Sequence, residues 1–463
     1  MAIDATRPPL PVTITPPPRP LGLWGAFRAA RRNILEIVPE PAYREPVVKG
    51  GGGRPGRMLL HPPAIEHVLK AKARAMPRSD VTLRLLRPTK GESLFTAPWE
   101  EWRWQHRAIA PVFQHRMLLS LSRAMTDSAG ATARRIAAAA PDGPVDVYHE
   151  MVVATFDVIN DVALSGRERL DRAAVAQGVT RFIETVARVS LLDILGAPEW
   201  IPRPARLLTG GARRLDAMVD GVIAERLARR AGRPAEDPDL LDMLIEARDP
   251  ESGRALSPVE LRNNLLAFIV AGHETTALAL TWALYLLALH PEAQARARTE
   301  AQGALSGEAA VAEDLPGLPY TRRVIAEALR LYPPAGFLAR TAKAPDPMDV
   351  EHGGGPIAPG ETVMIPVYAL HRHRLLWENP DAFDPERFAP EAVAARHRCA
   401  WLPFGAGPRV CIGMNFALME AAIILASVLA RLDFAPPEGF APRPRMILTL
   451  RPEGGMPLIA RRI

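Results

Sequence analysis

The apolar positions of this chain recur with a helical period through most of its middle. From about residue 99 to 305 the period is broken only by turns near 141–144, 166 and 198–204 and by the polar segment 229–239. A further helix is expected over about 320–331, closed by Pro333 and Pro334, and a last long helix over about 414–432. Helices therefore dominate the predicted fold.

Strand-like segments are few and short. The segment "RMLLH" after the glycine run 50–53 predicts a strand, and "PPAIEHVLKAKA" then predicts a helix that begins at proline. Short strand-like pieces also occupy 337–366, with glycines at their turns. The pattern predicts a mainly α fold with a small β subdomain.

The longest apolar stretch, 265–289, is long enough to span a membrane, but Glu274 lies at its middle. A charged side chain is costly at the centre of a bilayer, so a buried core helix is the expected structure. The N-terminus is rich in proline and has neither a basic region followed by an apolar one nor a long apolar run. No signal peptide or membrane anchor is therefore expected.

Composition supports an ordinary globular protein. The 463 residues are 48% hydrophobic and 23% charged, and no linker divides them, so we expect a Pro-rich N-terminal arm (1–45) and one domain (46–463). Two cysteines exclude a disulfide framework and favour the reducing cytoplasm. The net charge of +6 comes from arginines spread along the chain, without the dense basic run that marks a nucleic-acid-binding surface.

One of the cysteines, Cys411, lies in the glycine-rich segment "FGAGPRVCIG". It has no partner at zinc-site spacing, and a catalytic cysteine needs a base that sequence cannot locate, whereas axial ligation of a haem iron needs only one thiolate. Gly407 and Gly413 allow the backbone to approach a flat ring, Arg409 offers a guanidinium to a propionate, and Phe404 is placed to cover the sulfur. Cys411 also precedes the last predicted helix, whose N-terminus favours a thiolate.

This segment resembles the haem-binding loop of the cytochrome P-450 monooxygenases, F-x-x-G-x-R-x-C-x-G. A second motif, "EALR", resembles the E-x-x-R helix motif of the same family. The resemblance implies that Glu327 and Arg330 form a buried structural triad with Arg387 of "PERF". Without the other motifs, a solvated surface ion pair would be the simpler interpretation.

A third motif, "AGHETT", resembles the oxygen-activation signature of the family. The resemblance implies that Thr275 orients dioxygen and its water while Glu274 relays protons from solvent. The simpler alternative is a hydroxyl that donates to the carbonyl of Ala271, four residues earlier in the helix.

A fourth motif, "WRWQHR", matches the family pattern W-x-x-x-R/H, in which both residues contact haem propionates. Trp102 and His106 lie four residues apart on one helix face, although a core Trp beside a surface His is the alternative. Histidine replaces the commoner arginine, so this contact is expected to depend on pH. Arg340 lies where many members of the family place another propionate ligand.

The segment 92–102 is similar to the loop that precedes the propionate helix in bacterial fatty-acid hydroxylases of the family, where the residue matching Phe95 lies over the haem. The segment 189–204 falls where the family has its access lid. Further candidates for an apolar pocket, each equally compatible with plain core, are Phe268, Ile269, Ala271, Phe337 and Leu338.

The resemblance implies the cytochrome P-450 fold, with haem b (iron protoporphyrin IX) buried between the long central helix and the cysteine loop. It implies a monomeric monooxygenase that inserts one atom of O2 into a lipophilic substrate by hydroxylation or epoxidation. Electrons would come from a separate ferredoxin or flavodoxin with its NAD(P)H-dependent reductase, docking near Arg103, Arg107 and Arg398. The alternatives are a haem-thiolate peroxygenase, isomerase or dehydratase, and a non-catalytic haem sensor. The sequence offers no explanation for His371 and His373 in "HRHR".

Overall fold

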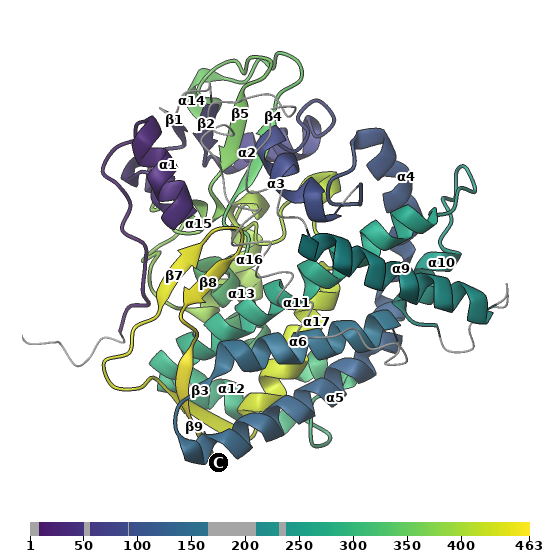
Figure 1. Ribbon diagram of the computed structural model, residues 1–463. Helices are drawn as coiled ribbons and strands as arrows, with labels where there is room; N and C mark the ends of the chain where they lie inside the picture. The colour runs from purple at the N-terminus through teal and green to yellow at the C-terminus, as the bar shows by residue number, and fades with distance from the viewer. Residues whose placement is uncertain (1–8, 51–55, 91, 165–209, 231–237) are drawn as a thin grey trace, which may run out of the picture.

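The computed structural model describes residues 9–50, 56–90, 92–164, 210–230 and 238–463 (Figure 1). Helices make up most of these residues, which confirms the predicted fold class. The α-helices are α1 Leu23–Arg32, α2 Pro62–Glu66, α3 Asp80–Lys90, α4 Trp99–Ile109, α5 His115–Ala139, α6 Val147–Leu164, α9 Gly210–Arg230, α10 Leu240–Glu246, α11 Pro258–Leu289, α12 Pro291–Ala304, α13 Pro319–Leu331, α14 Val350–Gly353, α15 Val367–Leu370, α16 Pro390–Ala395 and α17 Met414–Leu429.

The strands form three small sheets. The four-stranded sheet has the order β1-β2-β5-β4, the three-stranded sheet the order β3-β9-β6, and β7 and β8 form a hairpin. All pairs are antiparallel except β2 and β5, whose register joins Met58 to Met364. The strands are β1 Val47–Lys49, β2 Gly56–Leu59, β3 Val145–Asp146, β4 Leu338–Thr341, β5 Thr362–Ile365, β6 Leu432–Ala435, β7 Arg443–Met446, β8 Leu450–Glu453 and β9 Pro457–Arg462.

The long helix α11 runs through the centre of the helical part, beside α6, α13 and α17 (Figure 1). It begins with a capping box, in which the Ser257 side chain accepts from the Glu260 backbone N–H and the Glu260 carboxylate accepts from the Ser257 N–H. Its length and composition would allow it to cross a membrane, yet 72% of its most apolar window is buried inside the protein. The packing agrees with the predicted core helix.

The N-terminal arm is attached to this core where it is described. The Tyr332 hydroxyl donates to the Val12 carbonyl at 2.7 Å, and the Ile14 N–H donates to the Tyr368 hydroxyl at 3.3 Å. Tyr332 in turn stacks on Trp282 of α11, with 4.0 Å between the ring centroids. Proline cannot donate a backbone hydrogen bond, but its carbonyl can accept one, and the Pro17 carbonyl accepts from the Glu40 N–H at 2.8 Å.

Two predicted elements end earlier than expected. The helix that begins at Pro62 becomes a π-helix over His67–Ala71, and the last long helix stops at Leu429, after which β6 begins at Leu432. The predicted access lid at 189–204 lies outside the described residues.

Candidate functional site

The cysteine loop joins a short 3-10 turn, Gly407–Arg409, to the start of α17. The Cys411 N–H donates to the Phe404 carbonyl at 3.0 Å, which closes the loop. Gly407 has a φ of +74°, and a Cβ there would lie 2.1 Å from the Leu69 carbonyl oxygen. Gly407 therefore allows the loop to pack against the π-helix and lies outside the cavity lining, which corrects the expectation that it approaches the cofactor.

A cavity of about 390 Å³ lies between the cysteine loop and α11, and Cys411 faces it. Gly413 also lines the cavity, and a Cβ at this position would meet nothing within 4 Å. Ile269 and Glu274 do not line the cavity. The structure places the following predicted residues in the lining: Phe95, Trp102, His106, Phe268, Ala271, Thr275, Phe337, Leu338, Arg340, Phe404, Arg409, Cys411 and Gly413.

Cys411 is exposed, and it lines this cavity, which protein atoms surround. Burial raises the pKa of the Cys411 thiol, while the Gly413 backbone N–H and the charge of Arg78 act in the opposite direction. The N-terminus of α17 was expected to favour the thiolate and so to lower the pKa of Cys411. Desolvation has the opposite effect and is larger. A thiolate here requires a cation in the cavity, as axial ligation of iron would provide.

Three arginines gather at one side of the cavity: Arg340, which is buried, and Arg78 and Arg409, which are half-buried. Among the described residues no carboxylate pairs with them, and burial lowers the pKa of Arg78 to about 9 and of Arg340 and Arg409 to about 10. The buried Nε of Arg78 and Nη1 of Arg409 have no hydrogen-bond partner. Cations whose buried donor nitrogens lack partners fit the two propionates of haem b.

Arg78 was not predicted. It forms a β-bridge with Arg340, and its guanidinium lies 4.2 Å from the centroid of the Phe95 ring. The sequence "PRSD" carries no signal that distinguishes this arginine from the many others in the chain. Only the bridge between segments far apart in sequence brings it to the site.

Trp102 and His106 lie side by side on α4, with 4.9 Å between their ring centroids. Arg409 stacks over Trp102, 4.4 Å from its ring centroid. Burial, and then the charge of Arg409, lower the pKa of His106. The ring is therefore neutral near pH 7 and can offer an N–H to an acceptor in the cavity.

The two residues of the oxygen-activation signature point in different directions. Thr275 lines the cavity, and its hydroxyl donates to the Ala271 carbonyl at 2.7 Å, as the simpler interpretation expected. Glu274 is buried on another side of α11, where its carboxylate accepts from the Thr449 hydroxyl at 3.1 Å and pairs with Arg451. In this arrangement Glu274 does not reach the cavity directly.

Glu327 and Arg330 form a fully buried, doubly hydrogen-bonded pair on α13, with N–O distances of 2.6 and 2.7 Å. Arg330 also donates to three carbonyls, among them those of His371 and Ala382. Arg387 lies 3.5 Å from Glu327 without making a hydrogen bond through its Nε. Removing one member of such a buried set typically costs about 3–5 kcal/mol.

His371 connects this pair to the cysteine loop. Its Nδ1 lies 3.1 Å from the Arg330 carbonyl, and its Nε2 accepts from the Leu402 N–H at 2.7 Å. This pattern defines a neutral ring with the proton on Nδ1. His373 lies 3.2 Å from the Glu45 carbonyl, so both histidines of the unexplained stretch hold backbone segments together.

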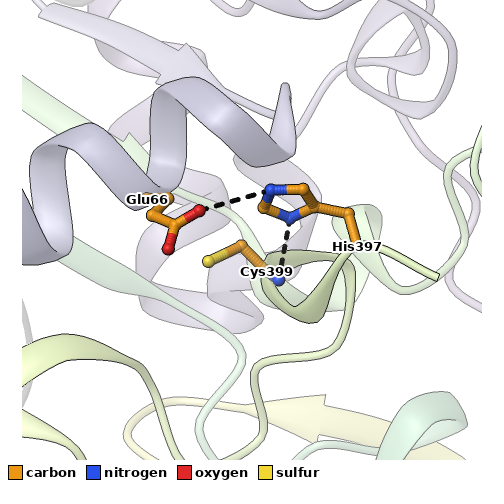
Figure 2. A group of neighbouring side chains, drawn as sticks. All are labelled: Glu66, His397 and Cys399. Atoms are coloured by element: carbon orange, nitrogen blue, oxygen red, sulfur yellow. Dashed lines mark hydrogen bonds and ion pairs between the residues drawn. The ribbon is translucent and has the colours of Figure 1, made fainter. Parts of the chain in front are cut away.

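Glu66, His397 and Cys399 gather beside the loop, and their ligand atoms lie within 4.8 Å of one another (Figure 2). His397 Nδ1 accepts from the Cys399 N–H at 3.1 Å, so its proton resides on Nε2, which points to Glu66 at 3.3 Å. Metal ligation through Nε2 would leave the ring without a proton, whereas ligating histidines normally donate their second N–H. Lys70 and Arg398 already neutralise Glu66. The cluster therefore fastens the start of the cysteine loop to α2.

The arginines expected to attract a redox partner are paired within the chain. Arg107 makes two hydrogen bonds to Asp249, at 2.7 and 2.9 Å. Arg103 lies 3.6 Å from Glu251, and Arg398 lies 2.8 Å from Glu66. Their contribution to the attraction of an acidic partner is smaller than that of free arginines.

A lone cysteine facing an apolar cavity, with cations beside it and a long helix above, defines a haem-thiolate protein. The chain belongs to the cytochrome P450 family, whose sequence model matches residues 42–458. Members of this family bind haem b and are monooxygenases. They take a lipophilic substrate, O2 and electrons from a redox partner.

Two curated relatives come from Streptomyces melanosporofaciens. Cyclooctatin synthase is 33% identical, over 95% of this chain and 94% of its own length. Cyclooctat-9-en-7-ol 5-monooxygenase is 32% identical, over 95% of this chain and 93% of its own. Among solved structures, the cytochrome P450DA heme domain superposes with a TM-score of 0.76 at 28% identity, covering 90% of both chains.

Proposed function

We propose that this protein hydroxylates a neutral, lipophilic substrate of the polycyclic hydrocarbon or terpenoid class. The observation that carries the proposal is the chemistry of the cavity lining. Among the described residues, its charged or titratable side chains are Arg78, His106, Arg340, Arg409 and Cys411, all in or beside the group that fits the cofactor.

The remaining described lining is almost wholly apolar, and Thr82, Thr275 and Thr276 are its hydroxyl-bearing side chains. A fatty acid needs a cation or several hydrogen-bond donors for its carboxylate, because a buried unpaired charge is costly. A neutral polycyclic compound needs only complementary apolar surface. The name of one relative, cyclooctat-9-en-7-ol 5-monooxygenase, is that of a monooxygenase of an alcohol, which favours a neutral substrate.

In this proposal each part of the chain has a separate task. When bound, the haem supplies the oxidising chemistry that the protein side chains lack. Cys411 supplies the thiolate ligand, and Arg78, Arg340 and Arg409, with Trp102 and His106, hold the propionates. The apolar walls orient the substrate and exclude water.

Proton delivery is assigned to the signature in α11. Thr275 offers a hydroxyl at the cavity wall, and its present donation to Ala271 is the bond that it would exchange. Glu274 lies next to it in sequence and is paired with Arg451 on another side of the helix, so as a proton relay it would have to turn toward Thr275. Electrons are assigned to a separate ferredoxin or flavodoxin with its NAD(P)H-dependent reductase.

The test is a spectral titration of the ferric holoprotein with a polycyclic diterpene alcohol and, in parallel, with laurate. The diterpene should displace water from the iron at lower concentration than laurate. Turnover with a ferredoxin, its reductase and 18O2 should then place one labelled atom in the product. Preferential binding of laurate would overturn the substrate class, and product formation that requires peroxide instead of O2 would favour the peroxygenase alternative.

A further inference from the structure

The carboxylate of Glu274 is held by the hairpin β7–β8. Thr449 Oγ1 donates to Glu274 Oε1 at 3.1 Å, and Arg451 Nη2 pairs with the same oxygen. Arg451 Nε also lies 3.3 Å from Thr449 Oγ1, so the three side chains form a closed triangle. The Glu274 side chain is 5% exposed and that of Arg451 is 23% exposed. Arg451 thus connects a buried carboxylate to the protein surface.

Tyr148 of α6 completes this environment. Burial, followed by the charge of Glu274, raises the pKa of the Tyr148 hydroxyl, so the tyrosine stays neutral near the carboxylate. With one hydroxyl donor and one cation bound to it, Glu274 is stabilised in a position turned away from the cavity.

The same hairpin also forms part of the cavity wall. Met446, at the end of β7, and Leu448, in the turn, line the cavity. Leu448, which contacts the cavity, and Thr449, which holds Glu274, are consecutive residues. A bulky molecule that displaces Leu448 must therefore shift the backbone that carries Thr449.

We propose that Thr449 and Arg451 are positioning residues for Glu274, and that filling the cavity against Leu448 loosens their hold and frees the carboxylate to turn toward Thr275. The inference rests on the proposed monooxygenase function, because freeing Glu274 has a use only in proton delivery. The experiment that tests it measures ligand binding and does not require turnover. A ligand shifts such an equilibrium only by its different affinity for the two positions. Because coupling is reciprocal, weakening the hold must strengthen the binding of a bulky ligand.

The experiment measures ligand binding to the ferric holoprotein by the shift of its Soret band, without turnover. Clotrimazole is a bulky azole chosen to fill the cavity as far as Leu448. Imidazole is a small azole that would bind the iron without contacting the hairpin. In Arg451→Met, clotrimazole should bind about 3- to 10-fold more tightly than in the wild type, whereas the affinity for imidazole should not change. Thr449→Val should shift clotrimazole binding in the same direction, and it serves as the second variant if Arg451→Met does not fold.

Two further variants separate positioning from general loosening of the hairpin. In the Glu274→Gln background, Arg451→Met should no longer alter clotrimazole binding, because no carboxylate remains to be held. Arg445 pairs with Arg451 across the hairpin but binds Glu453, so Arg445→Met is the matched control and should leave both affinities unchanged. The proposal would be overturned if Arg451→Met changed the affinities for clotrimazole and imidazole equally. It would also be overturned if neither Arg451→Met nor Thr449→Val changed the affinity for clotrimazole. These binding results stand whether or not the diterpene test supports the proposed function.

Discussion

His371 offers a sharp test of how the buried polar groups hold the cysteine loop. Burial, followed by the charge of Arg330, lowers the pKa of His371 to about 3, from an ordinary value of 6.5. The folded protein therefore keeps the ring neutral at pH values where the unfolded chain binds a proton. Stability is fully present above pH 6.5 and is lost as the pH falls through 6.5 toward 3.

The size of this loss follows from the two pKa values. Between pH 7 and pH 5 the proton taken up by His371 in the unfolded chain should lower the free energy of unfolding by about 2 kcal/mol. In His371→Gln this contribution is absent. At pH 7, however, the variant should be less stable by about 1–3 kcal/mol, because the Arg330 carbonyl and the Leu402 N–H lose good partners.

The assay is urea unfolding of the ferric holoprotein, followed by tryptophan fluorescence, at pH 7 and pH 5. The gap in unfolding free energy between wild type and His371→Gln should narrow by about 2 kcal/mol at pH 5, since other titrating groups cancel in the difference. His149 is exposed, so His149→Gln is the matched control and should follow the wild type at both values. A gap that stays constant would show that His371 is not kept neutral by the fold.

Three further outcomes are expected. Cys411→Ser should abolish the far-red-shifted Soret band of the reduced protein with carbon monoxide, while Cys399→Ser, which alters only the buried thiol beside the loop, should keep it. Thr275→Ala should still bind haem and ligands, but the ratio of product to reductant consumed should fall and peroxide should appear; full coupling would mean that the hydroxyl only donates to the helix backbone. Burial raises the pKa of Glu420 to about 8, so the wild type should lose stability as pH rises from about 4.5 toward 8, and Glu420→Gln should show a flatter melting temperature over that range; parallel curves would contradict this reasoning.

Sequence periodicity was sufficient for the long helices of the core, but it missed α1, which lies inside the expected Pro-rich arm, and the short helices α14, α15 and α16. Among the long helices α11 is an example, since its capping box and its unbroken apolar run fix both its start and its core position. The strands β6 to β9 were not predicted. Each is four to six residues long, and β7, β8 and β9 carry arginine and proline, which are not typical of strands.

Motif reasoning placed most of the site residues at one cavity but could not orient them. Glu274 and Thr275 are adjacent in a signature, yet a helix turns about 100° between neighbours, so they face different surroundings. The residues that bind Glu274 away from the cavity, Thr449 and Arg451, belong to the β7–β8 hairpin, which is far from α11 in sequence. The motif alone therefore could not predict the direction of the Glu274 side chain. Gly407 was identified correctly as a place where only glycine fits, but the group that requires it is the Leu69 carbonyl.

The three arginines at the cavity connect the chemistry of the site to the stability expected of the fold. Arg78, Arg340 and Arg409 lie against the cavity with no carboxylate partner among the described residues, and each has a lowered pKa. Like charges that share a poorly solvated site oppose folding unless an anion joins them. A haem with two propionates supplies that anion, and anything that binds only the folded chain stabilises it. If these three side chains hold the propionates, haem binding should stabilise the folded chain, and removing any one of the three arginines should reduce that stabilisation.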